Sequence, residues 1–260
     1  MLVDVHCHLM HEKFSRDLDK VIERARRSNV KVIICSGVNV PTNREALKLA
    51  EKYDIVKASL GLYPLDLLGE NIEGVGLTRQ IKPFVLEDEL KFIRKNKDRI
   101  VGVGECGLDF KFSSNKRKQI ENFEKIIRFV EKIKKPLIVH SRKAEKECLD
   151  LLESSSLKKV LLHCFSGKKS LIKRGYDLGY FFSVPAIITR LQHFQTLVEI
   201  VDINNLLTET DAPWLSPYPD KRNEPAFVKE AINKISEIKK LNRKEVENIV
   251  FMNYQNLFLG

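Results

Sequence analysis

Short runs of apolar and β-branched residues recur along the chain, and a longer charged segment follows each run. The runs have the length and composition of buried β-strands, whereas the segments between them repeat their apolar residues at helical spacing. This alternation predicts an α/β fold in which helices cover a parallel sheet. The predicted strands are Leu2–His8, Lys31–Gly37, Ile55–Pro64, Arg99–Asp109, Pro136–Arg142, Lys159–Gly167, Tyr180–Ala186 and Leu206–Trp214.

Eight strands that alternate with helices predict a closed (β/α)8 barrel, the TIM barrel. The 260 residues are close to the roughly 250 residues of such a barrel, and no linker divides them, so we expect one domain over residues 1–260. The clearest helices are expected at residues 115–135, Glu224–Lys240 and Arg243–Phe258. Residues 66–83 and 213–225 have no regular period and are predicted to be loops after the third and eighth strands.

The composition favours a cytoplasmic protein. Apolar residues make up 43% of the chain, yet no run approaches the ~18 apolar residues of a membrane span, and the start lacks a secretory signal. The cysteines are odd in number and have no framework spacing, which predicts reduced thiols. The net charge of +10 would attract nucleic acid. Because the basic residues are spread along the chain, a heat-adapted surface of mixed ion pairs is an equally simple explanation.

Two histidines, one residue apart, end the first predicted strand. Side chains alternate between the two faces of a strand, so His6 and His8 point the same way and Cys7 points the other way. Two imidazoles on one face can bind a single metal ion, although such a pair also occurs as ordinary packed or surface histidine.

The ends of four further strands carry groups that can bind metals. In (β/α)8 enzymes the functional side chains come from the carboxyl ends of the strands, and these ends meet at one mouth of the barrel. We therefore expect one cluster of metal ligands at this mouth. Its members are His6, His8, Glu105, His140, His163 and Asp211.

Six such groups suit two divalent ions better than one ion with an open position. Glu105 is the predicted bridge between the ions, and Asp211 is predicted to bind one ion and to act as general base. Imidazole and carboxylate ligands are compatible with Zn, Mn, Mg or Ni, and the sequence does not distinguish them. Cys7, Cys106 and Cys164 each follow a predicted ligand, so alternation predicts that they point away from the mouth as small core residues.

Six motifs in this order, spanning residues 3–225, resemble those of the TatD family of metal-dependent deoxyribonucleases: VDVHCHL, GECGLDF, VHSR, LHCFSG, ETDAPWLSP and RNEP. The resemblance implies an amidohydrolase-like barrel with its metal ligands at the six positions already singled out. It also implies that the substrate is DNA and that the reaction is phosphodiester hydrolysis, often as a 3′ to 5′ exonuclease.

One motif departs from the family. The third strand ends in GLYPL, with Tyr63 and Leu65 where the family commonly has histidines. The first of these histidines faces the active site in relatives, and Tyr63 could supply a hydroxyl donor in its place. The departure leaves open another metal-dependent hydrolase on the same barrel, with amide, lactone or deaminase chemistry. A third alternative is a protein that binds nucleic acid or metal without turnover, although such a protein has no need of this ligand set.

Substrate-binding residues are predicted near the ligands. Arg142 shares the face of His140 and could bind phosphate, or could form an ion pair at the start of a helix. Ser166, Arg222 and Asn223 lie in motifs of the resemblance, which implies that they bind substrate or support the ligands.

Other polar and aromatic residues near the strand ends receive more ordinary interpretations. Asp109 and Glu209 are predicted to be structural, and His11 and His193 to have surface or packing roles. Trp214 could stack on a base or could cap the mouth of the barrel.

Overall fold

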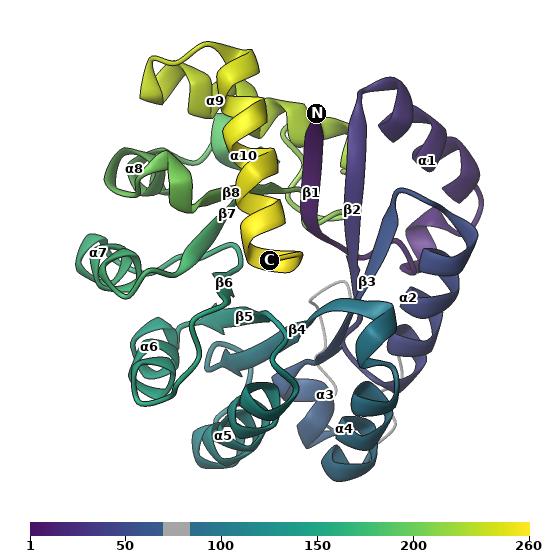
Figure 1. Cartoon of the computed structure of the whole chain (residues 1–260), viewed down its shortest axis with the longest axis vertical. Helices are drawn as coiled ribbons and strands as arrows, with labels where there is room; N and C mark the ends of the chain where they lie inside the picture. The colour runs from purple at the N-terminus through teal and green to yellow at the C-terminus, as the bar shows by residue number, and fades with distance from the viewer. Residues whose placement is uncertain (70–83) are drawn as a thin grey trace.

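The structure is a computed structural model, and it describes residues 1–69 and 84–260. It contains an eight-stranded parallel sheet in which the strands follow one another in sequence order (Figure 1). The strands are β1 (Leu2–Cys7), β2 (Val30–Ser36), β3 (Val56–Leu62), β4 (Ile100–Asp109), β5 (Leu137–Arg142), β6 (Val160–Leu162), β7 (Phe181–Pro185) and β8 (Leu206–Glu209). The predicted strands and the predicted barrel are confirmed.

The sixth and eighth strands end earlier than the sequence predicts. β6 ends at Leu162 and β8 at Glu209, and the predicted ends were Gly167 and Trp214. Beyond each end the backbone turns into the left-handed region, with φ of 43° at Cys164 and 54° at Asp211. The chain therefore leaves the strand at these two places, and strand alternation no longer tells where the side chains point.

The helices lie around the outside of the sheet (Figure 1). They are α1 (Leu18–Arg27), α2 (Val40–Lys52), α3 (Pro64–Leu68), α4 (Leu86–Lys95), α5 (Lys116–Ile133), α6 (Glu145–Glu153), α7 (Lys169–Asp177), α8 (Gln192–Ile200), α9 (Lys229–Lys239) and α10 (Arg243–Phe258). Short 3-10 helices are η1 (Glu12–Phe14), η2 (Lys97–Arg99), η3 (Ala186–Thr189), η4 (Ile203–Asn205) and η5 (Pro225–Val228).

The three helices predicted with bounds are present, although η5 occupies the first turn of the segment predicted at Glu224–Lys240. The predicted loop at 66–83 is wrong in its first residues, because Asp66–Leu68 belong to α3, which Pro64 begins and Gly69 ends in the left-handed conformation. Residues 70–83 of that predicted loop lie outside the described residues.

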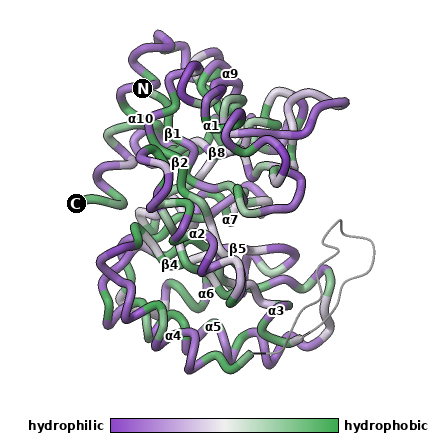
Figure 2. The backbone as a smooth tube through the Cα atoms, turned by 90° about the vertical axis from the view of Figure 1, so that its right-hand side faces the viewer, coloured by the Kyte–Doolittle hydropathy of each residue, from purple (hydrophilic) through white to green (hydrophobic). Residues whose placement is uncertain are grey.

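Helix α5 shows how the sequence directs the outer layer onto the sheet. The Asn115 side chain accepts a hydrogen bond from the backbone N–H of Lys118 and so caps the helix start. Phe123 and Val130 lie on one face and are fully buried against the barrel. Burying each such side chain stabilises the fold by about 1.5–3 kcal/mol. The outer helices, such as α4 and α5, alternate between hydrophobic and hydrophilic residues along the chain (Figure 2).

Side chains help to join β1 to β8 and so complete the ring of strands. The Thr208 hydroxyl donates to the Val3 carbonyl at 2.7 Å, and the Asp4 carboxyl accepts the backbone N–H of Thr210 at 2.9 Å. Burial raises the pKa of Asp4 well above its usual value. Further along, the Asp211 N–H donates to the His6 carbonyl at 2.9 Å, which brings two predicted ligands from opposite ends of the chain side by side.

The core is continuous across the barrel and its helices. Cys7 and Cys106 are fully buried in it, as the alternation of their strands predicts. Within residues 1–69 and 84–260, every helix is too short or too polar to cross a lipid bilayer.

Candidate metal centre

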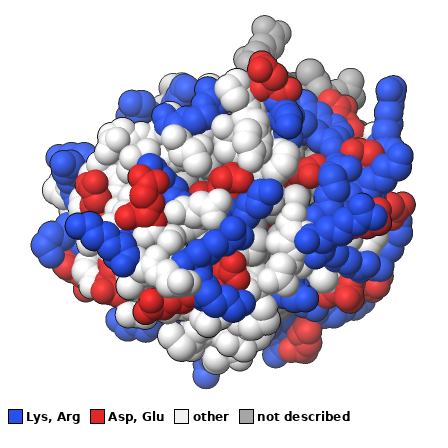
Figure 3. Space-filling model, turned by 90° about the horizontal axis from the view of Figure 1, so that it is seen from above, with Lys and Arg blue, Asp and Glu red and all other residues white. Residues whose placement is uncertain are grey.

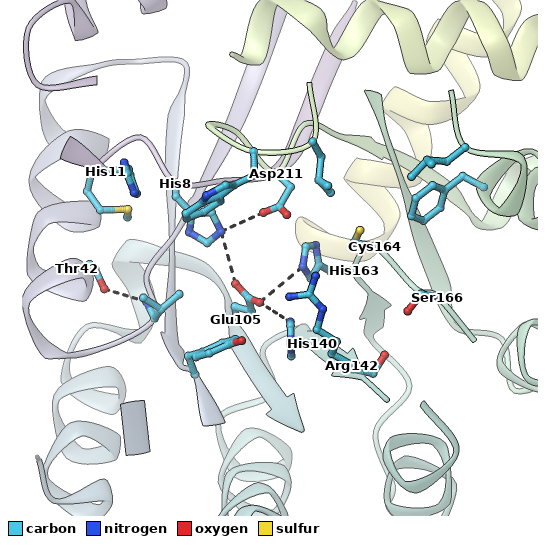
Figure 4. A pocket seen from close by; sticks show the side chains of 18 of the residues that line it. His8, His11, Thr42, Glu105, His140, Arg142, His163, Cys164, Ser166 and Asp211 are labelled. Atoms are coloured by element: carbon cyan, nitrogen blue, oxygen red, sulfur yellow. Dashed lines mark hydrogen bonds and ion pairs between the residues drawn. The ribbon is translucent and has the colours of Figure 1, made fainter. Parts of the chain in front are cut away.

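A pocket of about 670 Å³ opens at the carboxyl ends of the strands (Figure 4). Its polar floor is formed by side chains that the sequence places on five different strands or directly after them. Those at the pocket surface are His8, Glu105, His140, His163 and Asp211. His6 lies directly beneath, fully buried, with its ring stacked on that of His163 at a centroid distance of 3.7 Å.

Glu105 lies at the centre of the cluster and divides it into two halves. Its Oε2 atom faces the first-strand histidines, at 3.4 Å from His6 Nε2 and 3.5 Å from His8 Nε2. Its Oε1 atom faces the other pair, at 2.7 Å from His140 Nδ1 and 3.7 Å from His163 Nε2. Each carboxylate oxygen therefore has its own pair of imidazoles. Figure 4 shows Glu105 between His8 on one side and His140 and His163 on the other.

Asp211 belongs to the half that contains the first-strand histidines. Its Oδ1 atom is 3.2 Å from His8 Nε2 and 3.7 Å from His6 Nε2. The Asp211 side chain is 17% exposed, compared with 6% for Glu105. Of the two carboxylates, Asp211 is therefore the more accessible from the pocket.

The outward nitrogens of the histidine rings are fixed by acceptors. His8 Nδ1 lies 3.0 Å from the Ser36 carbonyl oxygen, and His163 Nδ1 lies 2.9 Å from Glu209 Oε2. A carbonyl or carboxylate oxygen only accepts, so each of these ring nitrogens carries the proton. In a neutral ring the lone pair is then at Nε2 and faces the cluster, which is the arrangement that a metal ion requires.

The charges of the cluster depend on its partners. Burial would raise the pKa of Glu105, but hydrogen bonds with His140 and His6 hold that pKa well below its usual value. Burial would lower the pKa of His163, but the nearby Glu209 and Glu105 carboxylates raise it to about 10. Without metal the carboxylates are therefore ionised, and a proton on His163 partly balances them.

The donor set fits divalent cations. Three groups of ligand atoms lie close enough to share an ion. Glu105 belongs to two of them, one with His6 and His8 and the other with His140 and His163. The third group joins His6, His163 and Glu209. Buried carboxylates require a compensating charge, and within residues 1–69 and 84–260 neither Glu105 nor Asp211 has a Lys or Arg partner. Divalent cations held by nitrogen and oxygen ligands would supply that charge.

The structure corrects the purely structural role predicted for Asp109 and Glu209. Glu209 accepts from His163, and Asp109 Oδ2 lies 3.2 Å from His140 Nε2, so each carboxylate orients a predicted ligand histidine. For Asp109 the signal was present in the sequence, since Asp109 follows Glu105 by four residues within β4, which places both side chains on one face of the predicted strand. Glu209 Oε1 is buried and has no hydrogen-bond partner among the described residues.

The prediction for Cys164 is wrong. Cys164 lines the pocket and is only half-buried, because β6 ends before it and the backbone has turned at this residue. His11 and His193, expected at the surface or in packing, also line the pocket. Trp214 lies at the mouth with its ring edge-on to His8 and His11, at centroid distances of 5.2 Å and 5.0 Å.

Three of the predicted substrate residues reach the pocket. Arg142, Tyr63 and Ser166 line it, and Arg142 points towards the ligand cluster (Figure 4). Among the described lining residues, Arg142 is the one with a permanent positive charge. The Tyr63 hydroxyl donates to Asp109 Oδ2 at 2.8 Å, and the Ser166 hydroxyl donates to Glu145 at 2.8 Å.

The other two predicted substrate residues are engaged elsewhere and are not among the residues that line the pocket. The Arg222 guanidinium forms an ion pair with Asp17 at 2.7 Å and also donates to the Lys13 carbonyl. Asn223 is fully buried, and its amide donates to the carbonyls of Thr210 and Trp214, which fixes the loop after β8.

Comparisons with known proteins identify the family of this chain. The family model described as TatD related DNase matches residues 3–259. The chain is 34% identical to human deoxyribonuclease TATDN3 over 263 residues, covering 99% of this chain and 94% of that protein. It is 32% identical to the uncharacterized metal-dependent hydrolase MJ1582 of Methanocaldococcus jannaschii, covering 98% and 96%. The crystal structure of YjjV, a TatD homolog from Escherichia coli, superposes with a TM-score of 0.87 at 25% identity, covering 100% and 98%.

Proposed function

The chain belongs to the TatD-related family of metal-dependent hydrolases, and from this premise we propose that it hydrolyses phosphodiester bonds in DNA. A relative of similar length carries the name deoxyribonuclease, and the pocket of this chain combines a candidate metal centre with an unpaired guanidinium. Arg142 forms no ion pair with a described acidic residue, so its fork of donors is available to a phosphate in the pocket.

The observation that carries the proposal is the division of the cluster by Glu105. We propose that two divalent ions bind, one on each side of this carboxylate. His6, His8 and Asp211 would hold the first ion, His140 and His163 would hold the second, and Glu105 would contribute one oxygen to each. When bound, such a pair of ions would make a water nucleophilic at neutral pH and would offset the charge that develops on the phosphate.

The residues of the chain supply the remaining chemistry. Asp211 is the more exposed carboxylate of the cluster, and we propose that it accepts the proton of the attacking water as general base. Arg142 would hold the phosphate over the cluster, and Ser166 would contact the substrate from the loop after β6. The Tyr63 hydroxyl already donates a hydrogen bond to Asp109, and Asp109 in turn contacts His140. The role of Tyr63 is therefore to hold Asp109 in place against His140.

The size of the pocket suits the end of a strand. A cavity of about 670 Å³ lies in the range of small-molecule sites and is too small to enclose a duplex. We therefore propose exonuclease action on an unpaired end, and the 3′ to 5′ direction follows the resemblance to the family.

The test is a nuclease assay on metal-free protein to which Zn, Mn, Mg or Ni is restored separately. We expect stepwise shortening of single-stranded DNA that stops when a chelator is added. Glu105→Ala should lose at least one ion and essentially all turnover. Glu245→Ala, which removes an exposed carboxylate of α10 that does not line the pocket, should keep its metal and its turnover. Metal-loaded protein that leaves DNA intact but turns over an amide, a lactone or an aminated ring would replace this proposal with another hydrolase of the same fold.

A further inference from the structure

Exposed cations gather on the loops that follow β4 to β7 and on the strand and helix ends that border these loops, on one side of the pocket mouth. We call them the basic rim, and each is exposed to solvent. Within residues 1–69 and 84–260, no member forms an ion pair with an acidic side chain. The members are Lys111, Lys116, Arg142, Lys143, Lys168, Lys169 and Arg190.

Many other basic side chains of this protein are neutralised locally. Arg24 and Arg174 each bind two carboxylates, and Lys173 pairs with Asp177 one helical turn away. On the face shown in Figure 3, Lys and Arg side chains lie among Asp and Glu side chains. Much of the positive charge elsewhere on the protein is therefore balanced by neighbouring carboxylates, whereas the charge of the basic rim is not.

Aromatic rings are interleaved with these cations. Lys116 Nζ lies 5.0 Å from the centroid of the Phe110 ring, and Lys111 Nζ lies 5.0 Å from that of Phe112. The Arg142 guanidinium lies 5.2 Å from the same Phe112 centroid. Both rings are only half-buried. Cations alternating with accessible rings are typical of surfaces that bind unpaired nucleotides, because phosphates contact the charges and bases stack on the rings.

The basic rim is continuous with the wall of the pocket. Arg142 belongs to both, Ser166 lines the pocket two residues before Lys168, and Leu191 lines it directly after Arg190. The opposite wall, from the segments after β1 and β8, contributes His11, Glu12, Trp214 and Leu215 and no lining Lys or Arg among the described residues. These segments also carry exposed cations, at Lys13, Arg16 and Lys221, but Glu12, Asp17 and Asp220 are interspersed among them in the sequence. A polyanion that leaves the pocket would therefore be attracted to the β4–β7 side.

We propose that the basic rim binds the backbone of a single-stranded polynucleotide whose end occupies the pocket. The inference rests on the proposed function for the identity of the strand, and it adds where the strand lies: over the loops after β4 to β7 and away from Trp214. An unpaired strand fits because bases can stack on the half-buried rings of Phe110 and Phe112 when they are not paired in a duplex, and because the pocket is too small to enclose a duplex.

Two triple variants with the same change in charge test this placement. The rim variant is Lys143→Gln with Lys168→Gln and Lys169→Gln, none of which lines the pocket. The control is Lys97→Gln with Lys134→Gln and Lys158→Gln, three exposed lysines that precede β4, β5 and β6 at the other end of the barrel and have no described ion pair. Lys143 and Lys134 are also matched in backbone conformation, with φ of 56° and 55°.

The binding probe is a fluorescent phosphorothioate oligothymidylate of about 12 nucleotides, which keeps its charges and resists hydrolysis. Its anisotropy is followed with the metal-loaded proteins at about 50 and about 200 mM salt. We expect the rim variant to bind the oligonucleotide roughly tenfold more weakly, or worse, at the lower salt concentration. The plot of log affinity against log salt should become less steep by about 2, since each lost phosphate contact reduces the magnitude of its slope by about 0.7. The control variant should match the parent.

Equal binding by both variants and the parent, or an equal loss in both variants, would overturn the proposal. Hydrolysis of a small diester, thymidine 5′-p-nitrophenyl phosphate, distinguishes a loss of strand binding from a loss of catalysis. Both variants should hydrolyse this diester at the parent rate. A parent that hydrolyses no diester, together with a rim variant that alone binds the oligonucleotide more weakly, would contradict the proposed hydrolysis and would support the proposed binding surface.

Discussion

The Nδ1 atom of His163 lies 2.9 Å from Oε2 of Glu209, and the Ser183 hydroxyl donates to the same oxygen at 2.7 Å. This contact fixes the plane of the imidazole and turns its Nε2 atom towards Glu105. His140 is held in the same manner by Asp109. Both histidines on the Oε1 side of Glu105 are thus oriented by a carboxylate from the interior of the barrel.

Glu209→Gln should therefore weaken metal binding on the Oε1 side of Glu105. The amide keeps the shape of the side chain but loses the charge that holds the Nδ1 proton, and changes of this kind cost about 10–100-fold in metal affinity. Competition with a fluorescent chelator measures that affinity. Glu145→Gln removes the same charge near the mouth without touching a histidine, so it should bind as the parent does. Equal affinity of Glu209→Gln and the parent would argue against an orienting role.

Metal binding should strengthen as the pH rises. The Glu209 and Glu105 carboxylates outweigh burial and raise the pKa of His163 from 6.5 to about 10, so the metal-free ring carries a proton at pH 7 that an ion must displace. Because the folded-state pKa is raised, the charged ring stabilises the metal-free fold fully below pH 6.5, and this contribution is lost as the pH rises to about 10. The Tm of metal-free protein should fall across that window, and the increase in Tm that metal produces should grow. Parallel pH profiles with and without metal would contradict this linkage.

Tyr63→Phe tests what the tyrosine does in place of the family's histidine. The ring is buried and the hydroxyl is donated to Asp109, so the variant should lose orientation of His140 and bind metal several-fold more weakly. At saturating metal its KM for a diester should equal that of the parent. A raised KM with unchanged metal affinity would instead mean that the hydroxyl contacts the substrate.

Thr208→Val tests the closure between β1 and β8. Its hydroxyl donates to the Val3 carbonyl at 2.7 Å, and valine has the same shape but leaves that buried carbonyl without its donor. The free energy of unfolding should fall by about 1–3 kcal/mol in chemical denaturation. Thr189→Val, at an exposed position, should stay within about 0.5 kcal/mol of the parent. A Thr208 variant as stable as this control would show that the bond contributes nothing to closure.

The sequence predicts the barrel and the gathering of the ligands for one physical reason. Parallel strands in a closed ring bring their carboxyl ends to one mouth, so residues as distant as His6 and Asp211 must meet if the strand ends are read correctly. Alternation also places Cys7 and Cys106 in the core, since both belong to a strand, β1 and β4.

The remaining features depend on where regular structure stops and on long-range partners. Cys164 could not be placed because its strand ends at Leu162 and alternation has no meaning beyond that point. The side chain of Arg222 pairs with Asp17, from the opposite end of the chain, and no local pattern encodes that choice. Glu209 is the last residue of β8, and the direction of its side chain towards His163 is a matter of side-chain packing.

Anomalous diffraction from crystals of the metal-loaded protein tests the two-ion centre most directly. We predict two peaks per chain, one beside His6, His8 and Asp211 and the other beside His140 and His163, with Glu105 contacting both. The two should lie about 3.5–4 Å apart. A single peak at full occupancy, or two peaks that do not share Glu105, would contradict the bridged centre on which the proposed hydrolysis depends.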